Sequence, residues 1–527
     1  MLRAAPLILS LALLTVTVIA PLATLLIYTL KISPLELPAL IGAELSRPLT
    51  LRVLRFTALQ AALSATLSLC LGLSVGLIGA LWRIRGFELV RGLGVVAFML
   101  PSMVVATSFR TVYGAGGLLS SHLPQLAVLG GGLSGIIAAH VFYNAPLALN
   151  LIYSSVTSIP RSQLEDAMLD GAGTYRLLID IVIPQALPAL VSSWALCFLY
   201  CFTSMGVPLL LGGPREWTLE VYIYYLTASL FELERGTVLA LLQLMFLAVL
   251  TYSYLKLAKV FEIAPIGSSL DLRAPRALKA LLYIAVSSFT AYEVIPLLGV
   301  AYSSLFNPFT GGFGLEGYLE LFSEGFYEVV GTGYLRVICN TLVIALLSAS
   351  IALALGTSAA LSSSQLMESL LFLPLITSPI TLALGLYLTY WGLAPNYVLI
   401  PIAHAAISAP LASRAIVEGA RRVPRELIDA TRIYSSGNPL AAVGALGPLL
   451  LPSLGTAAAF SLAISIGEFG ATLFLHTTET TTMTIAVYKL AAARRLQMAA
   501  AQSTMLAFFT AALAIMVLRI SSFKVSS

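Results

Sequence analysis

Long apolar runs separated by short polar segments dominate the chain. A helix needs about 20 apolar residues to cross a membrane, and twelve runs approach or exceed that length. They lie near residues 5–30, 55–82, 90–109, 126–157, 186–211, 236–258, 278–304, 336–362, 366–391, 395–420, 449–475 and 498–520. Barrel strands alternate apolar and polar positions, which these runs do not do. The pattern predicts an all-α integral membrane protein with about 12 transmembrane helices, the third of which is interrupted by Pro101.

Composition agrees with this pattern and removes several classes of function. Of the 527 residues, 59% are hydrophobic and 10% are charged, against about 45–50% and about 25% in soluble domains, so a soluble enzyme is excluded. The net charge is +5, but the sequence contains no basic face with interleaved aromatic residues that could bind a phosphate backbone. We therefore expect no nucleic-acid partner. Four cysteines without CxxC spacing and four scattered histidines predict no metal site and no cofactor bound by this chain.

The distribution of Lys and Arg predicts an orientation. If the N-terminus is cytoplasmic, eighteen of the 29 Lys and Arg residues fall in inside segments and eleven fall outside. Cytoplasmic loops carry the excess of positive charge in most membrane proteins. We therefore expect a multi-pass protein of the cell membrane, in contact with lipid, with its N- and C-termini in the cytoplasm.

The two halves of the chain resemble each other. The segments His140–Pro146 and His404–Pro410 are separated by 264 positions, as are Pro184 and Pro448, whereas Thr57 and Thr341 are separated by 284. We attribute the larger offset to additional residues in the second half, either between these two regions or in the segment before Arg336. Six spans per half give both copies the same orientation, so we expect two parallel repeats. The predicted organisation is residues 1–259 as first repeat, 260–276 as cytoplasmic linker and 277–527 as second repeat.

A polar loop between the fourth and fifth spans carries a recognisable pattern. It contains Glu165, Asp166, Ala167 and Gly171 and is followed by Pro184. Leu164, Met168 and Leu169 should form one apolar face of a short helix, and Gly171 should end that helix where a larger side chain would prevent close approach. A helix of this kind on the cytoplasmic surface can dock into a groove of a partner.

The second half has a matching loop that departs from the first in one position. Arg425, Asp429 and Ala430 follow Pro424 there, and Pro448 lies downstream. Asp429 stands where the first copy has Glu165, but Ser435 replaces the glycine. The two loops should therefore act unequally. An alternative is that both are ordinary amphipathic connectors.

Both loops resemble the EAA motif of permeases from binding-protein-dependent ABC importers. Most of each half, including the segments 202–214 and 218–222, looks like the fused permeases of iron(III) and thiamine importers, whereas Gly467 to Leu473 is also similar to sulfate and molybdate permeases. The resemblance implies a type I importer permease fold, two copies of a cytoplasmic ABC ATPase and an extracytoplasmic solute-binding protein. No P-loop motif occurs in the chain, so ATP and Mg²⁺ would be used by the partner ATPase.

Two other classes of function remain open at this point. A secondary transporter driven by an ion gradient would also have two six-span halves, but it would move solute without an ATPase. A membrane scaffold would bind partners and move nothing. Neither gives the repeated cytoplasmic Pro-Arg and acidic elements a purpose.

Polar residues within spans are the candidates for a transport pathway. Glu468 is an ionisable group at membrane depth, which is costly and suggests a pathway or gate. Its counterpart in the first repeat is Ser204, and Gly206 corresponds to Gly470. Gly467 and Gly470 would let helix backbones approach closely or permit the helix to break there. Glu293 and Asn144 are weaker candidates. The alternative for Glu468 is a structural hydrogen bond to a neighbouring helix.

Overall fold

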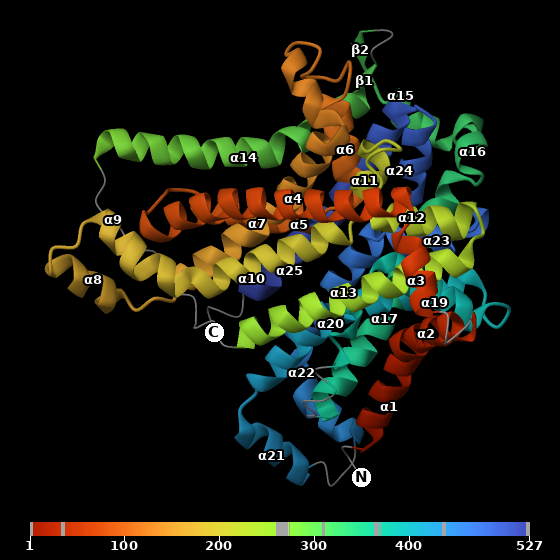
Figure 1. The fold of residues 1–527 in the computed structure, drawn as a ribbon. Helices are drawn as coiled ribbons and strands as arrows, with labels where there is room; N and C mark the ends of the chain where they lie inside the picture. Colours follow the sequence, from red (N-terminus) through yellow and green to blue (C-terminus); the bar gives the residue numbers. More distant parts are fainter. Residues whose placement is uncertain are drawn as a thin grey trace.

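The structure is a computed structural model that describes residues 4–32, 37–259, 272, 275–307, 311–362, 367, 370–434 and 439–522 (Figure 1). The described elements are helices apart from one short hairpin, in which Phe306 of β1 pairs with Phe313 of β2. The helices of the first half are α1 (Ala4–Leu14), the π-helix η1 (Thr15–Ile19), α2 (Ala20–Ile32), α3 (Leu37–Leu45), α4 (Pro48–Leu81), α5 (Phe87–Met99), α6 (Ser102–Tyr113), η2 (Pro124–Gly130), α7 (Gly132–Thr157), α8 (Arg161–Leu169), α9 (Thr174–Arg176), η3 (Leu177–Val182), α10 (Ile183–Phe202), α11 (Gly206–Leu211), α12 (Leu219–Tyr224), η4 (Tyr225–Ser229) and α13 (Leu233–Lys259).

The second half repeats this order with one hairpin added. Its elements are α14 (Arg276–Leu305), β1 (Phe306–Asn307), β2 (Gly312–Phe313), α15 (Glu316–Leu319), η5 (Glu320–Phe322), α16 (Glu324–Val330), α17 (Tyr334–Ser362), η6 (Leu373–Ile376), α19 (Pro379–Tyr390), α20 (Asn396–Arg421), α21 (Arg425–Tyr434), α22 (Pro439–Gly467), α23 (Gly470–Leu475), η7 (Thr478–Thr480), α24 (Met483–Ala492) and α25 (Leu496–Ser522). The expected linker, residues 260–276, lies almost entirely outside the described residues.

Ten described helices are long and apolar enough to cross a membrane, and there are eleven if the bent pair α5 and α6 counts as one span. These two helices meet at 105°, because Pro101 between them cannot continue α5 and instead caps α6. The expected count of twelve is not confirmed. Over the run near 366–391, the described helix α19 has only 12 residues, and several residues before it lie outside the described part of the chain.

Equivalent contacts relate the two halves. The Thr57 hydroxyl accepts a hydrogen bond from the Leu219 backbone N–H at 2.8 Å, and the Thr341 hydroxyl accepts one from the Met483 N–H at 2.9 Å. Each threonine therefore holds the start of the short helix that follows the broken span of its half, α12 or α24. The parallel repeat predicted from the offsets is visible in these matched bonds.

The additional residues lie in the first half, and the expectation that placed them in the second half was wrong. The change of offset means that the first half has 20 more residues between the threonine and the histidine. Most of them form the segment between α6 and α7, which contains η2, whereas α19 and α20 are joined by a short turn. A change of offset along the chain shows that one half has more residues in that interval. A decrease toward the C-terminus, as here, means that the first half has the additional residues.

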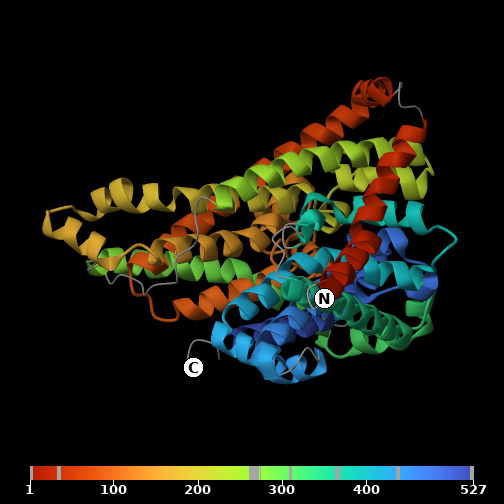
Figure 2. The same cartoon turned by 90° about the horizontal axis from the view of Figure 1, so that it is seen from below.

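The first span of each half packs against the other half. Helices α1 and α2 lie beside α17 and α19, as Figures 1 and 2 show, and the Tyr390 hydroxyl donates a hydrogen bond to the Val16 carbonyl at 2.9 Å. Helix α14 lies against α6, and its Tyr292 hydroxyl donates a hydrogen bond to the Ala138 carbonyl of α7. This exchange joins the two repeats into one packed body.

Candidate functional site

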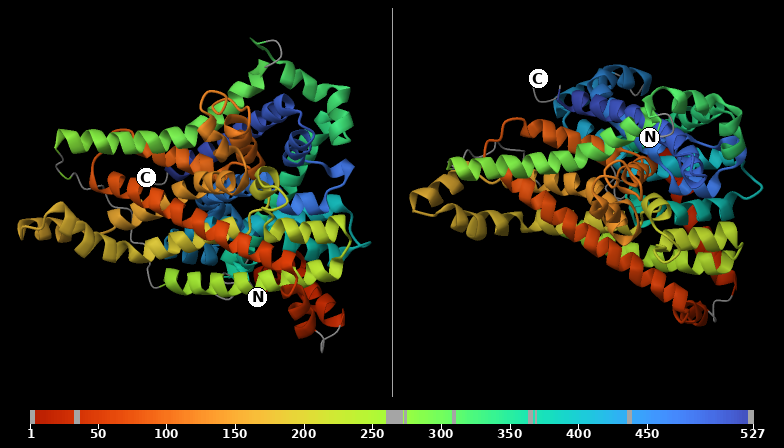
Figure 3. Two further views of the ribbon diagram at one scale, coloured as in Figure 1. Left: turned by 45° about the horizontal axis from the view of Figure 1, so that its top comes forward. Right: turned by 90° about the horizontal axis from the view of Figure 1, so that it is seen from above.

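The polar loop of the first half forms the exposed helix α8, which projects beyond the spans that it connects (Figure 3). Glu165 and Asp166 are exposed, and Ala167 is half-buried. Arg161 and Glu165 form an ion pair of 2.9 Å across one turn, with both side chains more than half exposed. Such an exposed pair stabilises a helix only slightly, so the acidic pair remains available at the surface.

The expected apolar face of α8 is divided. Leu164 is fully buried against the rest of the repeat, whereas Met168 is 44% and Leu169 is 85% exposed. The buried leucine fixes the helix, and the other two apolar side chains face away from the protein. Tyr175, in α9, is also 75% exposed. The tip of this projection is therefore an uncovered apolar surface.

Gly171 ends α8, but for a different reason from the one expected. Its φ is +86°, and a Cβ added there would meet no atom within 4 Å, so close approach plays no part. The Gly171 N–H donates to the Met168 carbonyl and the Ala172 N–H to the Ala167 carbonyl, at 3.1 and 2.9 Å. This is a Schellman cap, whose left-handed position favours glycine.

The loop of the second half forms the equivalent helix α21, at the same end of the molecule in Figure 1. Leu427, Ile433 and Tyr434 are 46%, 76% and 88% exposed. Ala430 is half-buried, while the side chains of Arg425 and Asp429 and the whole of Ser435 lie outside the described residues. Both halves thus present apolar side chains on a short polar helix. Pro184, in the first turn of α10, and Pro448, inside α22, are exposed.

Each half contains one broken span, and the breaks occupy equivalent positions. Helix α10 ends at Phe202 and α11 begins at Gly206, whereas α22 ends at Gly467 and α23 begins at Gly470. Ser204 is half-buried in the first break, and Glu468 is buried in the second. The break predicted at Gly467 and Gly470 is therefore present, and the first repeat has an equivalent break before Gly206.

The glycines are required because the breaks are tightly packed. A Cβ added to Gly206 would lie 2.4 Å from the Ser102 Oγ, at the start of α6, and one added to Gly470 would lie 3.2 Å from the Pro379 Cβ, at the start of α19. The same position at Gly470 is 3.8 Å from the Met205 sulfur of the other repeat. The two breaks therefore adjoin at the interface between the repeats.

Glu468 has hydrogen-bond partners at both carboxylate oxygens. The Ala471 and Thr472 backbone N–H groups each donate to it at 2.9 Å, and the Thr472 hydroxyl donates at 3.0 Å. The His404 Nε2 lies 3.2 Å from the same carboxylate. Glu468 therefore caps the first turn of α23, with its charge facing the positive end of that helix. No hydrogen bond joins it to Ser204 within the described residues.

His404 connects this cap to the adjacent spans. Its two ring nitrogens lie 2.7 Å from the Ser465 and Thr472 hydroxyls. In the first repeat, His140 has a longer contact of 3.4 Å, to Ser64. Both histidines thus contact polar groups of other helices, and these contacts are closer in the second repeat.

A second buried carboxylate, which sequence reasoning missed, links the two repeats. Glu220 of α12 is fully buried and accepts a hydrogen bond of 2.5 Å from the Gln243 amide of α13. The Gln243 oxygen in turn accepts hydrogen bonds from Ser378 and Thr381, at the start of α19, at 3.5 and 3.4 Å. An ionisable residue within an otherwise apolar segment was the available signal.

Asn144 lies apart from these groups. Its amide donates to the His140 carbonyl at 2.8 Å and contacts the Cys201 sulfur at 3.3 Å. These partners belong to α7 and α10 of the same repeat. The structure therefore places Asn144 in the core of the first repeat and does not bring it together with Glu468.

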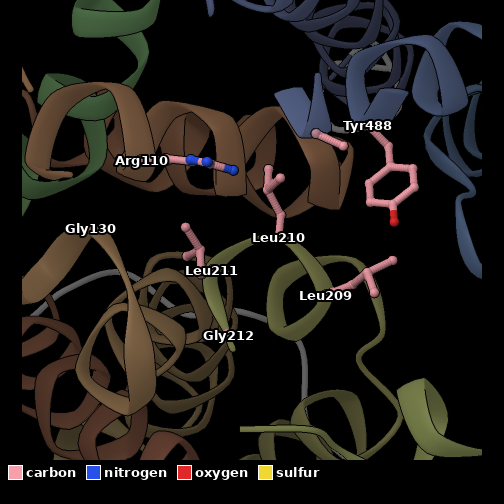
Figure 4. A pocket seen from close by; sticks show the side chains of 8 residues that line it. Arg110, Gly130, Leu209, Leu210, Leu211, Gly212 and Tyr488 are labelled. Atoms are coloured by element: carbon pink, nitrogen blue, oxygen red, sulfur yellow. The ribbon is translucent and has the colours of Figure 1, made fainter. Parts of the chain in front are cut away.

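A cavity of about 420 Å³ lies beside the two breaks, at the end of the molecule opposite α8 and α21 (Figures 1 and 4). Arg110 of α6, Leu209–Gly212 of α11 and its following turn, and Tyr488 of α24 line it. The Tyr488 ring packs against Phe469, directly after Glu468, with ring centres 5.6 Å apart. The cavity thus joins both repeats, and its inner wall is formed by residues next to the breaks.

Comparison with known proteins relates the first half of the chain to one family. Residues 68–262 match the family described as binding-protein-dependent transport system inner membrane component. The match covers less than half of the chain; together with the many apolar helices, it supports a multi-pass membrane transport subunit that is similar to the type I permeases of ABC importers.

Within that class, the chain resembles the fused thiamine permeases over most of its length. It is 26% identical over 441 residues to the thiamine transport system permease protein ThiP of Brucella abortus, covering 80% of this chain and 78% of that protein. It is 33% identical to ThiP of Haemophilus influenzae over 178 residues, covering 33% and 32%. A putative 2-aminoethylphosphonate transport system permease protein, PhnU of Salmonella typhi, is 30% identical over 147 residues, covering 26% of this chain and 50% of that protein.

Proposed function

We propose that this chain forms the entire membrane pathway of an ATP-driven importer. A solute-binding protein outside the cell delivers the solute, and two copies of a cytoplasmic ABC ATPase use ATP and Mg²⁺. The single observation that carries the proposal is the paired arrangement of α8 and α21. Two short polar helices, one per repeat, expose Leu169 and Ile433 at one end of the molecule, which is what two copies of one partner require.

The mechanism follows from how these helices connect to the breaks. Helix α8 precedes η3 and α10, and α21 precedes α22, so each docking helix leads directly into a span that breaks beside the other repeat. Movement of α8 and α21 toward each other as the ATPases close would rotate these spans. The packing between Gly470 and Met205 would then separate, opening a route from the cavity beside Tyr488.

The opposite end of the molecule has the features that a docking surface for a binding protein needs. The segment from β2 to α16 carries Glu316, Glu320, Glu324 and Glu328, all exposed and without an ion pair among the described residues. This end also holds the mouth of the cavity next to Arg110. A solute released there would enter between the two repeats.

Thiamine is the solute favoured by the relatives that cover most of the chain. Iron(III) and a sulfate- or molybdate-type oxyanion rest on resemblance alone. One observation favours a phosphonate as a second candidate. The Arg110 side chain lines the cavity and makes no hydrogen bond or ion pair in the described part of the chain, and one relative is named for 2-aminoethylphosphonate. Competition of the two compounds for uptake would separate these solutes.

Substitution at the exposed apolar positions tests the docking proposal. Leu169→Asp combined with Ile433→Asp places charges where an apolar partner surface would bind, so we expect at least a tenfold loss of ATPase retained on the purified permease. Because both side chains are exposed, membrane insertion and thermal stability should not change. Leu319→Asp is the matched control, since Leu319 is 70% exposed at the opposite end. Equal retention by the double variant and the control would overturn the proposal.

A further inference from the structure

A second cavity, of about 560 Å³, lies on the outer surface of the first repeat at the start of α4. Arg52, Arg55, Phe56 and Leu59 are among the residues that line it. The cavity is far in sequence from the helix breaks, and none of its lining residues takes part in the proposed pathway.

Both arginines in this cavity are exposed and lack protein partners. Neither makes a hydrogen bond or ion pair among the described residues. The nearby carboxylate of Glu44 is already occupied, because it pairs with Arg47 at 2.9 Å and with Arg235 at 2.6 Å. The positive end of the α4 helix adds to the two charges. The cavity therefore holds two unneutralised guanidinium groups, and no carboxylate lines it.

An apolar stripe continues from the cavity along the same helix. Leu59, Leu63, Leu67 and Leu71, spaced four residues apart, are 51%, 39%, 47% and 40% exposed. Residues at this spacing lie above one another on one helix face. Nothing in the described structure covers them, so this face of α4 contacts lipid.

The length of α4 places the two arginines at the depth of lipid headgroups. Trp82 and Arg83 directly follow the other end of the helix, and at 1.5 Å per residue about 40 Å separates Arg55 from Trp82. A bilayer is about 40–45 Å thick with its headgroups. Both ends of α4 thus carry residue types that anchor helices at the membrane surface.

We propose that this cavity binds the phosphate headgroup of an anionic phospholipid, with one acyl chain lying along the leucine stripe. Guanidinium groups form paired hydrogen bonds with phosphate oxygens, and an anionic headgroup neutralises both arginines. A lipid is favoured over an acidic protein surface because the charged cavity is continuous with the leucine stripe on the lipid-facing side of α4. The proposal depends on the membrane-embedded fold and is independent of the transported solute.

Lipid retention by the purified full-length chain tests this directly. The chain in neutral detergent is mixed with phosphatidylglycerol or phosphatidylcholine, and bound lipid is counted by native mass spectrometry alongside the thermal unfolding midpoint. Wild type should retain phosphatidylglycerol at least fivefold better and unfold at a higher temperature with it. Arg52→Gln with Arg55→Gln should lose that preference and that shift, whereas Arg52→Lys with Arg55→Lys should keep most of both.

The matched control is Arg215→Gln with Arg494→Gln, since both of these arginines are exposed elsewhere and make no ion pair among the described residues. It should behave as wild type does. Equal preference for phosphatidylglycerol in the Arg52 and Arg55 glutamine variant, or no preference in wild type, would overturn the proposal. A third result would also overturn it: the glutamine variant could keep its lipid preference while the solute-binding protein stimulates ATP hydrolysis by the partner ATPase less than it does with wild type. That result would assign the cavity to an acidic protein surface.

Discussion

Glu468 illustrates how one buried carboxylate can be satisfied inside a membrane protein. Two backbone N–H groups, one hydroxyl and His404 surround it, so its charge is compensated within the second repeat. The structure thereby supports the hydrogen-bonding alternative for this residue. We infer that Glu468 positions the break between α22 and α23, and that its influence on transport acts through that break.

A pair of substitutions separates this positioning role from a charge in the pathway. Glu468→Gln replaces one carboxylate oxygen, an acceptor, by an NH₂ group, a donor. This NH₂ group then faces either the Ala471 N–H or the Thr472 N–H and hydroxyl. The protein donor at that position loses its acceptor. Such a loss costs about 1–3 kcal/mol, so the thermal unfolding midpoint should fall, and Glu468→Leu should lower it further. Uptake should fall in step with stability. An unchanged midpoint with abolished uptake by the Gln variant would contradict the positioning role.

Whether the role of a single residue could be predicted from the sequence depended on how much of that role comes from distant residues. Glu468 and its flanking glycines stand out because charge and helix breaking are properties of the residues themselves. The cap that Glu468 forms depends on where α23 begins, which no local pattern shows. Glu220 was overlooked because its significance arises from Ser378 and Thr381, more than 150 residues away in the other repeat.

At the scale of elements, the broken spans and the short helices that follow them form a repeated unit. In each half, a buried threonine of α4 or α17 accepts the first N–H of α12 or α24. These bonds fix the segment that immediately follows the break. The apolar runs predict the spans well, but they cannot show that α5 and α6 meet at 105°, since Pro101 is compatible with both a kink and a sharp turn.

The matched threonines should have matched energetic effects. Thr57→Val and Thr341→Val each preserve side-chain shape but leave a buried backbone N–H without its acceptor, which costs about 1–3 kcal/mol. Both variants should lower the unfolding midpoint of the purified chain by similar amounts. Thr510→Val is the control, because the fully buried Thr510 hydroxyl donates only to carbonyls of its own helix. If Thr510→Val lowered the unfolding midpoint as much as the other two variants, the hydrogen bonds from Thr57 and Thr341 to α12 and α24 would contribute no additional stability.

The whole molecule differs from two repeats standing side by side. The first span of each half packs on the other half, and Glu220 and Gln243 of one half contact α19 of the other. Internal similarity predicted the parallel repeats and the end at which both docking helices lie. It could not predict the exchange of first spans. The apolar pattern of such a span is compatible with packing on its own half or on the other half.

Accessibility of single cysteines tests the orientation inferred from the Lys and Arg distribution. In a background without the exposed Cys70 and Cys339, Ser121→Cys should react with an impermeant reagent in intact cells, and Ser162→Cys should react only after the cells are opened. Both serines are exposed. Thr480 is a poor reporter at 8% exposed, so Ser323 replaces it as a second outside position. Labelling of Ser162→Cys in intact cells would invert the orientation.

The central claim, that one chain of two repeats imports a solute with ATP from a partner, is tested most directly by uptake into vesicles. The purified chain would be reconstituted with its partner ABC ATPase and solute-binding protein, and labelled thiamine would be followed with and without enclosed ATP and Mg²⁺. We predict uptake that requires all of these components and that is lost in the Leu169→Asp and Ile433→Asp double variant. Uptake by the chain alone, driven by an ion gradient and indifferent to ATP, would contradict the account.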